Sequence, residues 1–305
     1  MGGPWQLYHV PEHGVPGDVV RAAALAALQR VDTQMSNYSD QSDLMRVNAG
    51  PLLDFLPIPE DMHRVMACAD RYARLSDGAL NIALGRLVNV WGFGPDVTPD
   101  VRPDAAETRA QAARAALGSF ALRADPPAVF KHEDIALDLC ALAKGFAVDQ
   151  AARAVQALGI SNFMIEAAGE IAAFGQRANG QDWTIGLELP VPSEDRIVFD
   201  EIALHDMAVA TTGGHRNRRQ IDGQQVSHTI NPQTGVPLEG NLLSVTVLHK
   251  TCMDADALAT VLYVLGDEKG ATFADDNDVA ALFLIREPNG LREIRSEAFV
   301  ANTRQ

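Results

Sequence analysis

The order of strand-like and helix-like segments is the feature that most constrains the fold of this chain. Short apolar segments predict strands at residues 5–10, 135–139, 163–166, 170–174, 183–187, 207–211, 243–248 and 280–285. Apolar residues at helical spacing predict helices at residues 17–34, 60–76, 103–117, 144–158 and 253–265. The two kinds of element do not alternate in a strict strand–helix–strand rhythm. We therefore expect an α+β fold with a largely antiparallel sheet.

Composition limits the class of protein and of partner. The chain has 305 residues, enough for one large domain or two fused lobes, and 47% of them are hydrophobic and 21% charged, as in ordinary globular proteins. The formal net charge of −15 argues against nucleic acid as a partner, because phosphate binding needs a concentrated basic surface. The basic residues within 216–219 are too few for a duplex footprint.

Cysteine usage and hydropathy exclude two further classes. Cys68, Cys140 and Cys252 form no CxxC pair, so we expect no zinc site, and a single disulfide would leave one thiol free. No apolar run reaches the ~18 residues of a membrane-spanning helix. The first five residues do not resemble a signal peptide, although a chain trimmed after a signal would begin in the same way.

A pair of oxygen-bearing side chains suggests a metal site. Asp256 and Thr260 stand four residues apart in a predicted helix and therefore share one face. A carboxylate beside a hydroxyl is a hard donor set of the kind that Mg²⁺ accepts together with substrate phosphates. The structural alternative is that Asp254 caps the helix and Thr260 packs internally.

Two other clusters suggest anion binding and proton transfer. The segment from Asp138 to Gly145 is expected at a strand-to-helix junction, where free backbone N–H groups favour anions and Lys144 adds a positive charge. The alternative is a surface lysine at a helix start. His228 precedes an Asn-Pro turn at a strand end, and its imidazole can take a proton from a hydroxyl nucleophile, although a lone histidine is often structural.

The glycine-rich segments give weaker signals. Small residues between Glu166 and Glu170 either let a ligand approach the backbone or form a tight bulge. The segment from Gly92 to Gly94 lacks the third glycine of a dinucleotide fingerprint. There is no GxxxxGK[ST] loop and no GxSxG elbow, so the sequence supports neither a P-loop NTPase nor an α/β-hydrolase.

Taken in order, these clusters resemble the motifs of the ApbE family of FAD:protein FMN transferases, from residue 1 to about residue 266. The matching segments are Met35-Ser36-Asn37-Tyr38 with Ser42, Leu44 and Asn48; Leu87 to Gly94; Asp138 to Gly145 with Asp149; Gly169-Glu170-Ile171; Ser227 to Gly235; and Met253 to Thr260.

The resemblance implies a fold and a set of site residues. The fold is a single two-lobed α+β roll, with lobes at roughly residues 1–135 and 136–305 and FAD in the cleft between them. Mg²⁺ is expected on Asp256, Thr260 and the backbone carbonyl of Ala141, and His228 is expected to serve the catalytic proton transfer. The residues carried over as FAD contacts are Met35, Ala79, Leu80, Asn81, Asp138 and Lys144.

Several positions depart from the pattern of the family. Asn81 and Asn231 stand where the family usually has Asp, and Ala168 stands where it has Gly. The segment Thr212-Gly213-Gly214-His215 stands where it has Ser-Gly-Asp-Tyr.

The activity implied by the resemblance is the Mg²⁺-dependent transfer of FMN from FAD to a Ser or Thr hydroxyl of a client flavoprotein, with AMP as the leaving group. The client is expected in a membrane redox complex. Two alternatives use the same site: an FAD pyrophosphatase that accepts water, and an accessory protein that binds FAD without chemistry. The resemblance favours the periplasm and leaves a cytoplasmic location open.

Overall fold

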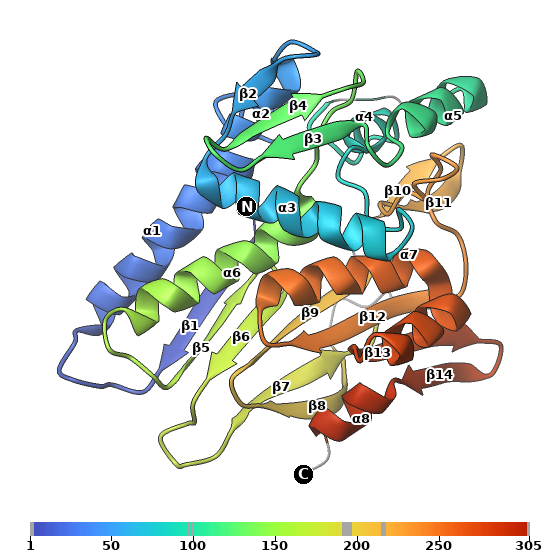
Figure 1. Ribbon diagram of the computed structural model, residues 1–305. Helices are drawn as coiled ribbons and strands as arrows, with labels where there is room; N and C mark the ends of the chain where they lie inside the picture. Colours follow the sequence, from blue (N-terminus) through green and yellow to red (C-terminus); the bar gives the residue numbers. More distant parts are fainter. Residues whose placement is uncertain (1–2, 97, 99, 191–196, 215–217, 304–305) are drawn as a thin grey trace. The chain divides into compact units, whose positions relative to one another are not determined.

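The chain divides into two compact units, each built from separate stretches of sequence. The first contains residues 1–31, 142–215 and 242–305, and the second contains residues 32–141 and 216–241. The computed structural model describes residues 3–96, 98, 100–190, 197–214 and 218–303 (Figure 1). His215, Arg216 and Asn217, which belong to the motifs considered above, lie outside the described residues.

A seven-stranded sheet forms the first unit, and every neighbouring pair of its strands is antiparallel, as the sequence predicts. Its order is β1-β5-β6-β9-β12-β13-β14. The strands are β1 (Trp5–His9), β5 (Phe163–Ala167), β6 (Glu170–Phe174), β9 (Met207–Gly213), β12 (Leu242–His249), β13 (Ala280–Glu287) and β14 (Gly290–Arg295).

Both faces of this sheet are covered, which is why the six inner residues of the central strand β12 are all buried. On one face, Leu282 and Leu284 of β13 pack in a cluster with Trp183 of the hairpin β7 (Trp183–Glu188) and β8 (Val198–Leu204). Phe299 of α8 (Glu297–Thr303) closes the same cluster. The opposite face carries α7 (Cys252–Asp276), which packs on β9, β12 and β13.

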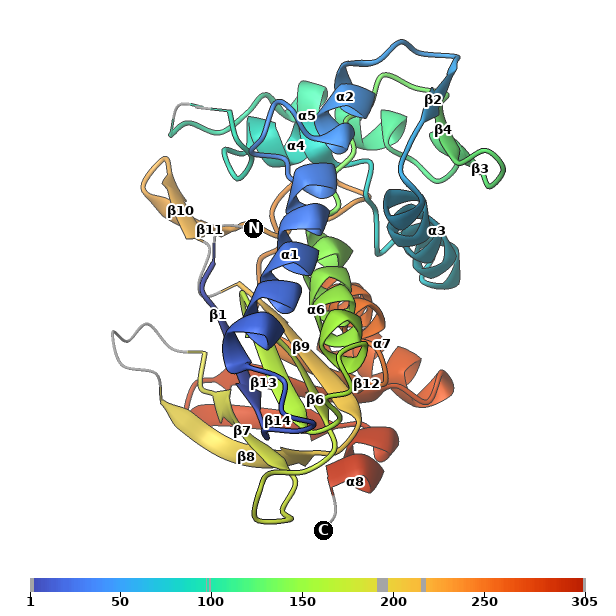
Figure 2. The same ribbon diagram turned by 90° about the vertical axis from the view of Figure 1, so that its left-hand side faces the viewer.

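Two more helices, α6 (Cys140–Gln156) and α1 (Gly17–Met35), continue the layer of α7, with α6 between the other two (Figure 2). The helix α6 lies next to α1, where Arg30 donates to Gln150 at 3.4 Å. Gly266, predicted to end α7, instead produces a kink with φ 83°, and the helix continues to Asp276. Glycine adopts this left-handed conformation without a steric penalty, so the break falls there.

The second unit is smaller and mixed. Its three-stranded antiparallel sheet has the order β2-β4-β3, and β10 and β11 form a separate hairpin. The elements are α2 (Asp43–Ala49), β2 (Phe55–Pro57), α3 (Glu60–Leu75), α4 (Gly85–Val90), α5 (Ala105–Arg114), β3 (Phe120–Arg123), β4 (Ala128–Lys131), β10 (Arg218–Ile221) and β11 (Gln224–Ser227).

Residues 135–139 do not form the predicted strand. Ala136 makes only an isolated parallel bridge to Leu84, and α6 begins at Cys140, four residues before the predicted start at Lys144. Asp138 explains the early start, because its Oδ1 accepts the Cys140 N–H at 2.8 Å and satisfies one of the first free donors of the helix. Among the described residues, no helix is both long and apolar enough to cross a bilayer.

Candidate functional site

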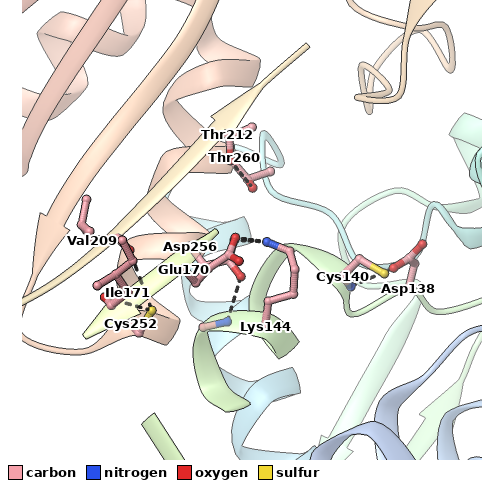
Figure 3. A network of polar contacts seen from close by, with 11 residues as sticks. Asp138, Cys140, Lys144, Glu170, Ile171, Val209, Thr212, Cys252, Asp256 and Thr260 are labelled. Carbon is pink, nitrogen blue, oxygen red and sulfur yellow. Dashed lines mark hydrogen bonds and ion pairs between the residues drawn. The ribbon is translucent and has the colours of Figure 1, made fainter. Parts of the chain in front are cut away.

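The first unit brings two acidic side chains and one lysine together (Figure 3). Lys144 on α6 donates to Oε1 of Glu170, the first residue of β6, and to Asp256 Oδ1 on α7 at 3.2 Å. Glu170 and Asp256 are each 2% exposed, whereas the Lys144 side chain keeps 32% of its surface. The lysine therefore reaches from an accessible position into a buried acidic pair.

The electrostatics of this cluster follow from its burial. Burial alone lowers the pKa of Lys144, but the charges of Asp256 and Glu170 outweigh it, so the pKa lies above its ordinary value. Burial raises the pKa of Glu170 to about 7 and also raises the pKa of Asp256, while Lys144 opposes both shifts. One ammonium thus faces two carboxyl groups, and this arrangement favours the uptake of a further positive charge.

Thr260 stands one turn after Asp256 on α7, as predicted from the sequence. Its Oγ1 lies 3.3 Å from Oγ1 of Thr212 on β9. The helix therefore presents a carboxylate and then a hydroxyl, and the adjacent strand adds a second hydroxyl beside Thr260.

The carboxylates of Asp256 and Glu170 and the hydroxyl of Thr260 form a set of oxygen donors that fits a hard divalent cation. Glu170 Oε2 is buried and has no hydrogen-bond partner among the described residues. Such an atom is costly unless a proton or cation satisfies it. No three His, Cys, Asp or Glu side chains gather as a metal cluster in the described part of the chain. Mg²⁺ needs only one or two carboxylates beside substrate phosphates, so Asp256 with Thr260 is a sufficient protein contribution.

In the second unit, three sequence motifs meet around a pair of rings. The His228 ring lies 6.3 Å from the Phe93 ring, edge to face at 67°. Tyr38 OH donates to the Phe93 carbonyl at 3.3 Å, and Trp91 Nε1 donates to the Gly235 carbonyl at 2.8 Å. These contacts place the predicted base among the motifs at 35–38, 87–94 and 227–235.

Predicted FAD contacts also gather in the second unit. The segment 79–82 runs beside Asp138, whose N–H donates to the Ile82 carbonyl at 2.7 Å. Ala79, Leu80 and Met35 are buried. Asn81 holds its own loop, because Nδ2 donates to the Ala115 carbonyl at 2.7 Å and Oδ1 accepts the Ala83 N–H at 2.8 Å. Contact of these residues with FAD stays a prediction.

The structure also accounts for two departures from the family pattern. Asn231 Oδ1 accepts the N–H groups of Gln233 and Thr234 at 2.9 and 3.2 Å, a turn-capping role that Asp performs equally well. Ala168 is the first residue of the two-residue turn between β5 and β6 and has φ 56°, a conformation that favours glycine. The turn directly precedes Glu170 and so helps to position this residue beside Asp256.

Sequence reasoning missed two members of the cluster in the first unit. In the sequence, Glu170 belongs to a matching motif but carries no expected role, and Thr212 appears only as a departure from the family pattern. Both lie on strands that meet α6 or α7 through long-range packing, and local spacing carries no signal for such contacts. The acidic residue at the first position of β6 is the one clue, because a charge is rarely fully buried without a partner.

Comparison with known sequences finds a family model and named relatives that match most of the chain. The ApbE family model matches residues 1–283. A Vibrio cholerae protein named FAD:protein FMN transferase is 36% identical over 301 residues, covering 98% of this chain and 89% of that protein. A Haemophilus influenzae protein of the same name is 34% identical, covering 90% of this chain and 80% of that protein.

Solved structures agree with the sequence comparison. The flavin transferase ApbE from Vibrio cholerae has a TM-score of 0.90 and 33% identity, and covers 99% of this chain and 96% of its own. The apo form of the flavinyl transferase ApbE from Pseudomonas stutzeri has a TM-score of 0.86 and 32% identity, covering 99% of this chain and 97% of its own. The match extends along nearly the whole chain in both sequence and fold, and the chain therefore belongs to the ApbE family.

Proposed function

We propose that this chain, a transferase by its family, moves FMN from FAD to a Ser or Thr hydroxyl of a client flavoprotein in a reaction that requires Mg²⁺ and releases AMP. The observation that carries the proposal is the buried pair Asp256 and Glu170 sharing the single ammonium of Lys144, with Thr260 one turn beyond Asp256. The names of the relatives support flavin transfer as the reaction.

The proposed ligands of Mg²⁺ are Asp256, Thr260 and the backbone carbonyl of Ala141. A helical N–H ordinarily donates to the carbonyl four residues earlier, which for Gly145 is that of Ala141. The Gly145 N–H donates to Asp256 Oδ2 at 3.1 Å, so it is not held by the Ala141 carbonyl alone, and a carbonyl oxygen has a second lone pair that could bind a cation. When bound, Mg²⁺ would neutralise the FAD pyrophosphate and stabilise charge on the transferring phosphorus group.

The protein side chains supply positioning and proton transfer. Lys144, whose side chain keeps 32% of its surface accessible, would offer its ammonium to a phosphate oxygen of FAD. His228 accepts the proton of the client hydroxyl while the hydroxyl oxygen forms its bond to the FMN phosphorus and the bond to the AMP oxygen breaks. A positioned base of this kind typically contributes ~10²–10⁴ in rate.

We also propose that the client belongs to a membrane redox complex and that transfer takes place in the periplasm. Both parts rest on the resemblance in sequence. The client is expected to offer a Ser or Thr in an accessible segment, because the hydroxyl must enter a site built for a dinucleotide.

The test combines FAD, Mg²⁺ and a candidate acceptor domain, with covalent flavin followed by in-gel fluorescence and AMP by chromatography. We expect both products from the wild type, neither from Asp256→Ala, and at least a hundredfold slower transfer by His228→Ala with FAD still bound. AMP release without any covalent flavin, with or without the acceptor, would support the pyrophosphatase alternative. Unchanged transfer by Asp256→Ala would refute the metal assignment.

A further inference from the structure

The helices α6 and α7 exchange carboxylate contacts where they approach each other. Gly145 N of α6 donates to Asp256 Oδ2 of α7. In the opposite sense, the N–H groups of Cys252 and Met253 of α7 donate to Oδ1 and Oδ2 of Asp149 of α6, at 2.8 and 3.0 Å. Gly145 and Asp149 are one turn apart on α6, and Cys252 and Asp256 are one turn apart on α7, so the two contacts are reciprocal.

Asp149 satisfies donors that α7 cannot satisfy itself. Cys252 and Met253 carry the first two N–H groups of the helix, and no helical carbonyl lies within reach of them. Of the first three N–H groups, the N-cap residue Thr251 accepts only the third, that of Asp254, through its side-chain Oγ1 at 3.4 Å. The two oxygens of Asp149 therefore fix both the position and the rotation of the first turn of α7.

The backbones leave no room for this turn to shift toward α6. A Cβ on Gly145 would stand 2.3 Å from the Cys252 carbonyl oxygen, well inside contact distance. Steric contact thus limits approach, and the forked hydrogen bond of Asp149 limits separation. Asp256 follows Cys252 by one turn of the same helix. The position of its carboxylate therefore depends on the Asp149 hydrogen bonds and on the contact between Gly145 and Cys252.

We propose that Asp149 is a positioning residue for the metal-binding carboxylate: it holds the first turn of α7 against α6, so that Asp256 receives the Gly145 N–H and faces Lys144. This inference rests on the proposed function, because it takes Asp256 as a Mg²⁺ ligand. Removing a group that orients a metal ligand commonly lowers metal affinity ~10–100-fold.

The same unit offers a matched control. Glu12 Oε2 accepts the Ser161 N–H at 2.9 Å and Oε1 accepts the Asn162 N–H at 3.1 Å. Like Asp149, it is a carboxylate bridging two consecutive backbone N–H groups. Because it holds the segment before β5 rather than α7, its loss should affect stability without affecting the metal ligand.

The experiment titrates Mn²⁺, an oxygen-seeking stand-in for Mg²⁺, into the full chain with FAD present, and follows free Mn²⁺ by electron paramagnetic resonance. Thermal melting confirms that each variant is folded. We expect Asp149→Asn, which keeps one acceptor oxygen, to weaken binding about tenfold and Asp149→Ala to weaken it further. Glu12→Gln should bind within twofold of the wild type.

The outcomes separate the two proposals. Wild-type affinity in folded Asp149→Asn and Asp149→Ala, with binding lost in Asp256→Ala, would overturn the role of Asp149 and leave the metal site standing. Equal weakening by Glu12→Gln would also overturn it, because the effect would then be one of general stability. Absence of Mn²⁺ binding by the wild type, or full binding by Asp256→Ala, would instead refute the assignment of Asp256 as a metal ligand.

Discussion

Gly145 and Cys252 meet at a distance that no side chain larger than hydrogen allows, with 2.3 Å between an ideal Cβ on Gly145 and the Cys252 carbonyl oxygen. The clashing atom belongs to the backbone, so it cannot rotate away. The closeness of the two helices at this point lets the Gly145 N–H reach Asp256.

We therefore expect Gly145→Ala to push α7 away from α6. The cost should be about 1–3 kcal/mol of unfolding free energy, the usual range for overpacking, together with weaker metal binding. Urea denaturation measures the first effect and Mn²⁺ titration the second. Gly17→Ala in α1 is the control, because its Cβ would meet only His9 Nε2 at an ordinary 3.5 Å. Equal stability of Gly145→Ala and the wild type would contradict the close approach.

Lys144→Met should leave Glu170 and Asp256 facing each other without their shared cation. Removing one partner from a buried charged group costs about 3–5 kcal/mol. We expect this loss near pH 8 and a smaller one near pH 5, where the pKa of Glu170, raised by burial to about 7, lets that carboxyl group hold a proton. Adding Glu170→Gln to Lys144→Met should recover part of the stability. A loss that is independent of pH would argue against carboxylate repulsion as its cause.

Asn81→Asp, which restores the usual residue of the family, should destabilise this chain. The Nδ2 donor to the Ala115 carbonyl would become an oxygen facing an oxygen, at a cost of about 1–3 kcal/mol. Asn231→Asp is the matched change, because Asn231 Oδ1 accepts two N–H groups and a carboxylate accepts them as well. Thermal melting of the two variants should show a clear drop only for Asn81→Asp; similar melting curves would refute the distinction.

Ala168→Gly should stabilise the chain by about 1 kcal/mol, because Ala168 has φ 56° and pays the steric penalty of the left-handed region. Chemical denaturation measures the gain. Ala173→Gly on the neighbouring strand β6 is the control, and it should destabilise, since Ala173 is buried in an extended conformation. A loss of stability in Ala168→Gly would show that the turn is not strained.

Asp149 should make stability depend on pH. Burial raises its pKa to about 6, although the N–H groups of Cys252 and Met253 oppose the shift. The pKa of an unfolded Asp is about 3.9, so the folded chain holds this proton more tightly. Proton binding by Asp149 therefore adds most to the free energy of unfolding below about pH 4. This pH-dependent part declines as the pH rises to about 6, by at most about 3 kcal/mol. Asp149→Asn should lack this decline in denaturation curves recorded from pH 4 to 7, and parallel profiles of the two proteins would contradict the assignment.

The sequence predicts those parts of the site that depend on residues close together along the chain. Asp256 and Thr260 share a helix face, so their spacing of four is enough to place them together. Residues 135–139 mislead because their alternation of large apolar residues with small or polar ones has the pattern of a strand, while the tertiary structure uses the segment as a connection with one isolated bridge. Asp138 is a residue type that precedes helices, and its side-chain bond to Cys140 explains why α6 begins earlier than its apolar stripe suggests.

Long-range contacts account for what the sequence could not supply. The meeting of Lys144 with Glu170 depends on β6 lying under α6, and no spacing along the chain encodes it. The hydrogen bonds of Asp149 to Cys252 and Met253 likewise join residues about a hundred positions apart. Such contacts follow from the packing of α6 and α7 on the sheet.

The discontinuous course of the sheet unit has a consequence for biosynthesis. Its first strand, β1, leaves the ribosome early but must wait for β5, which begins at Phe163, before it gains a neighbour. The helix carrying Asp256 and the strands β12 to β14 come from the last quarter of the chain. Contacts between such distant segments form slowly, because the closure of large loops precedes the stabilising contacts. Premature termination anywhere before α7 would thus yield a chain with an open sheet edge and without Asp256.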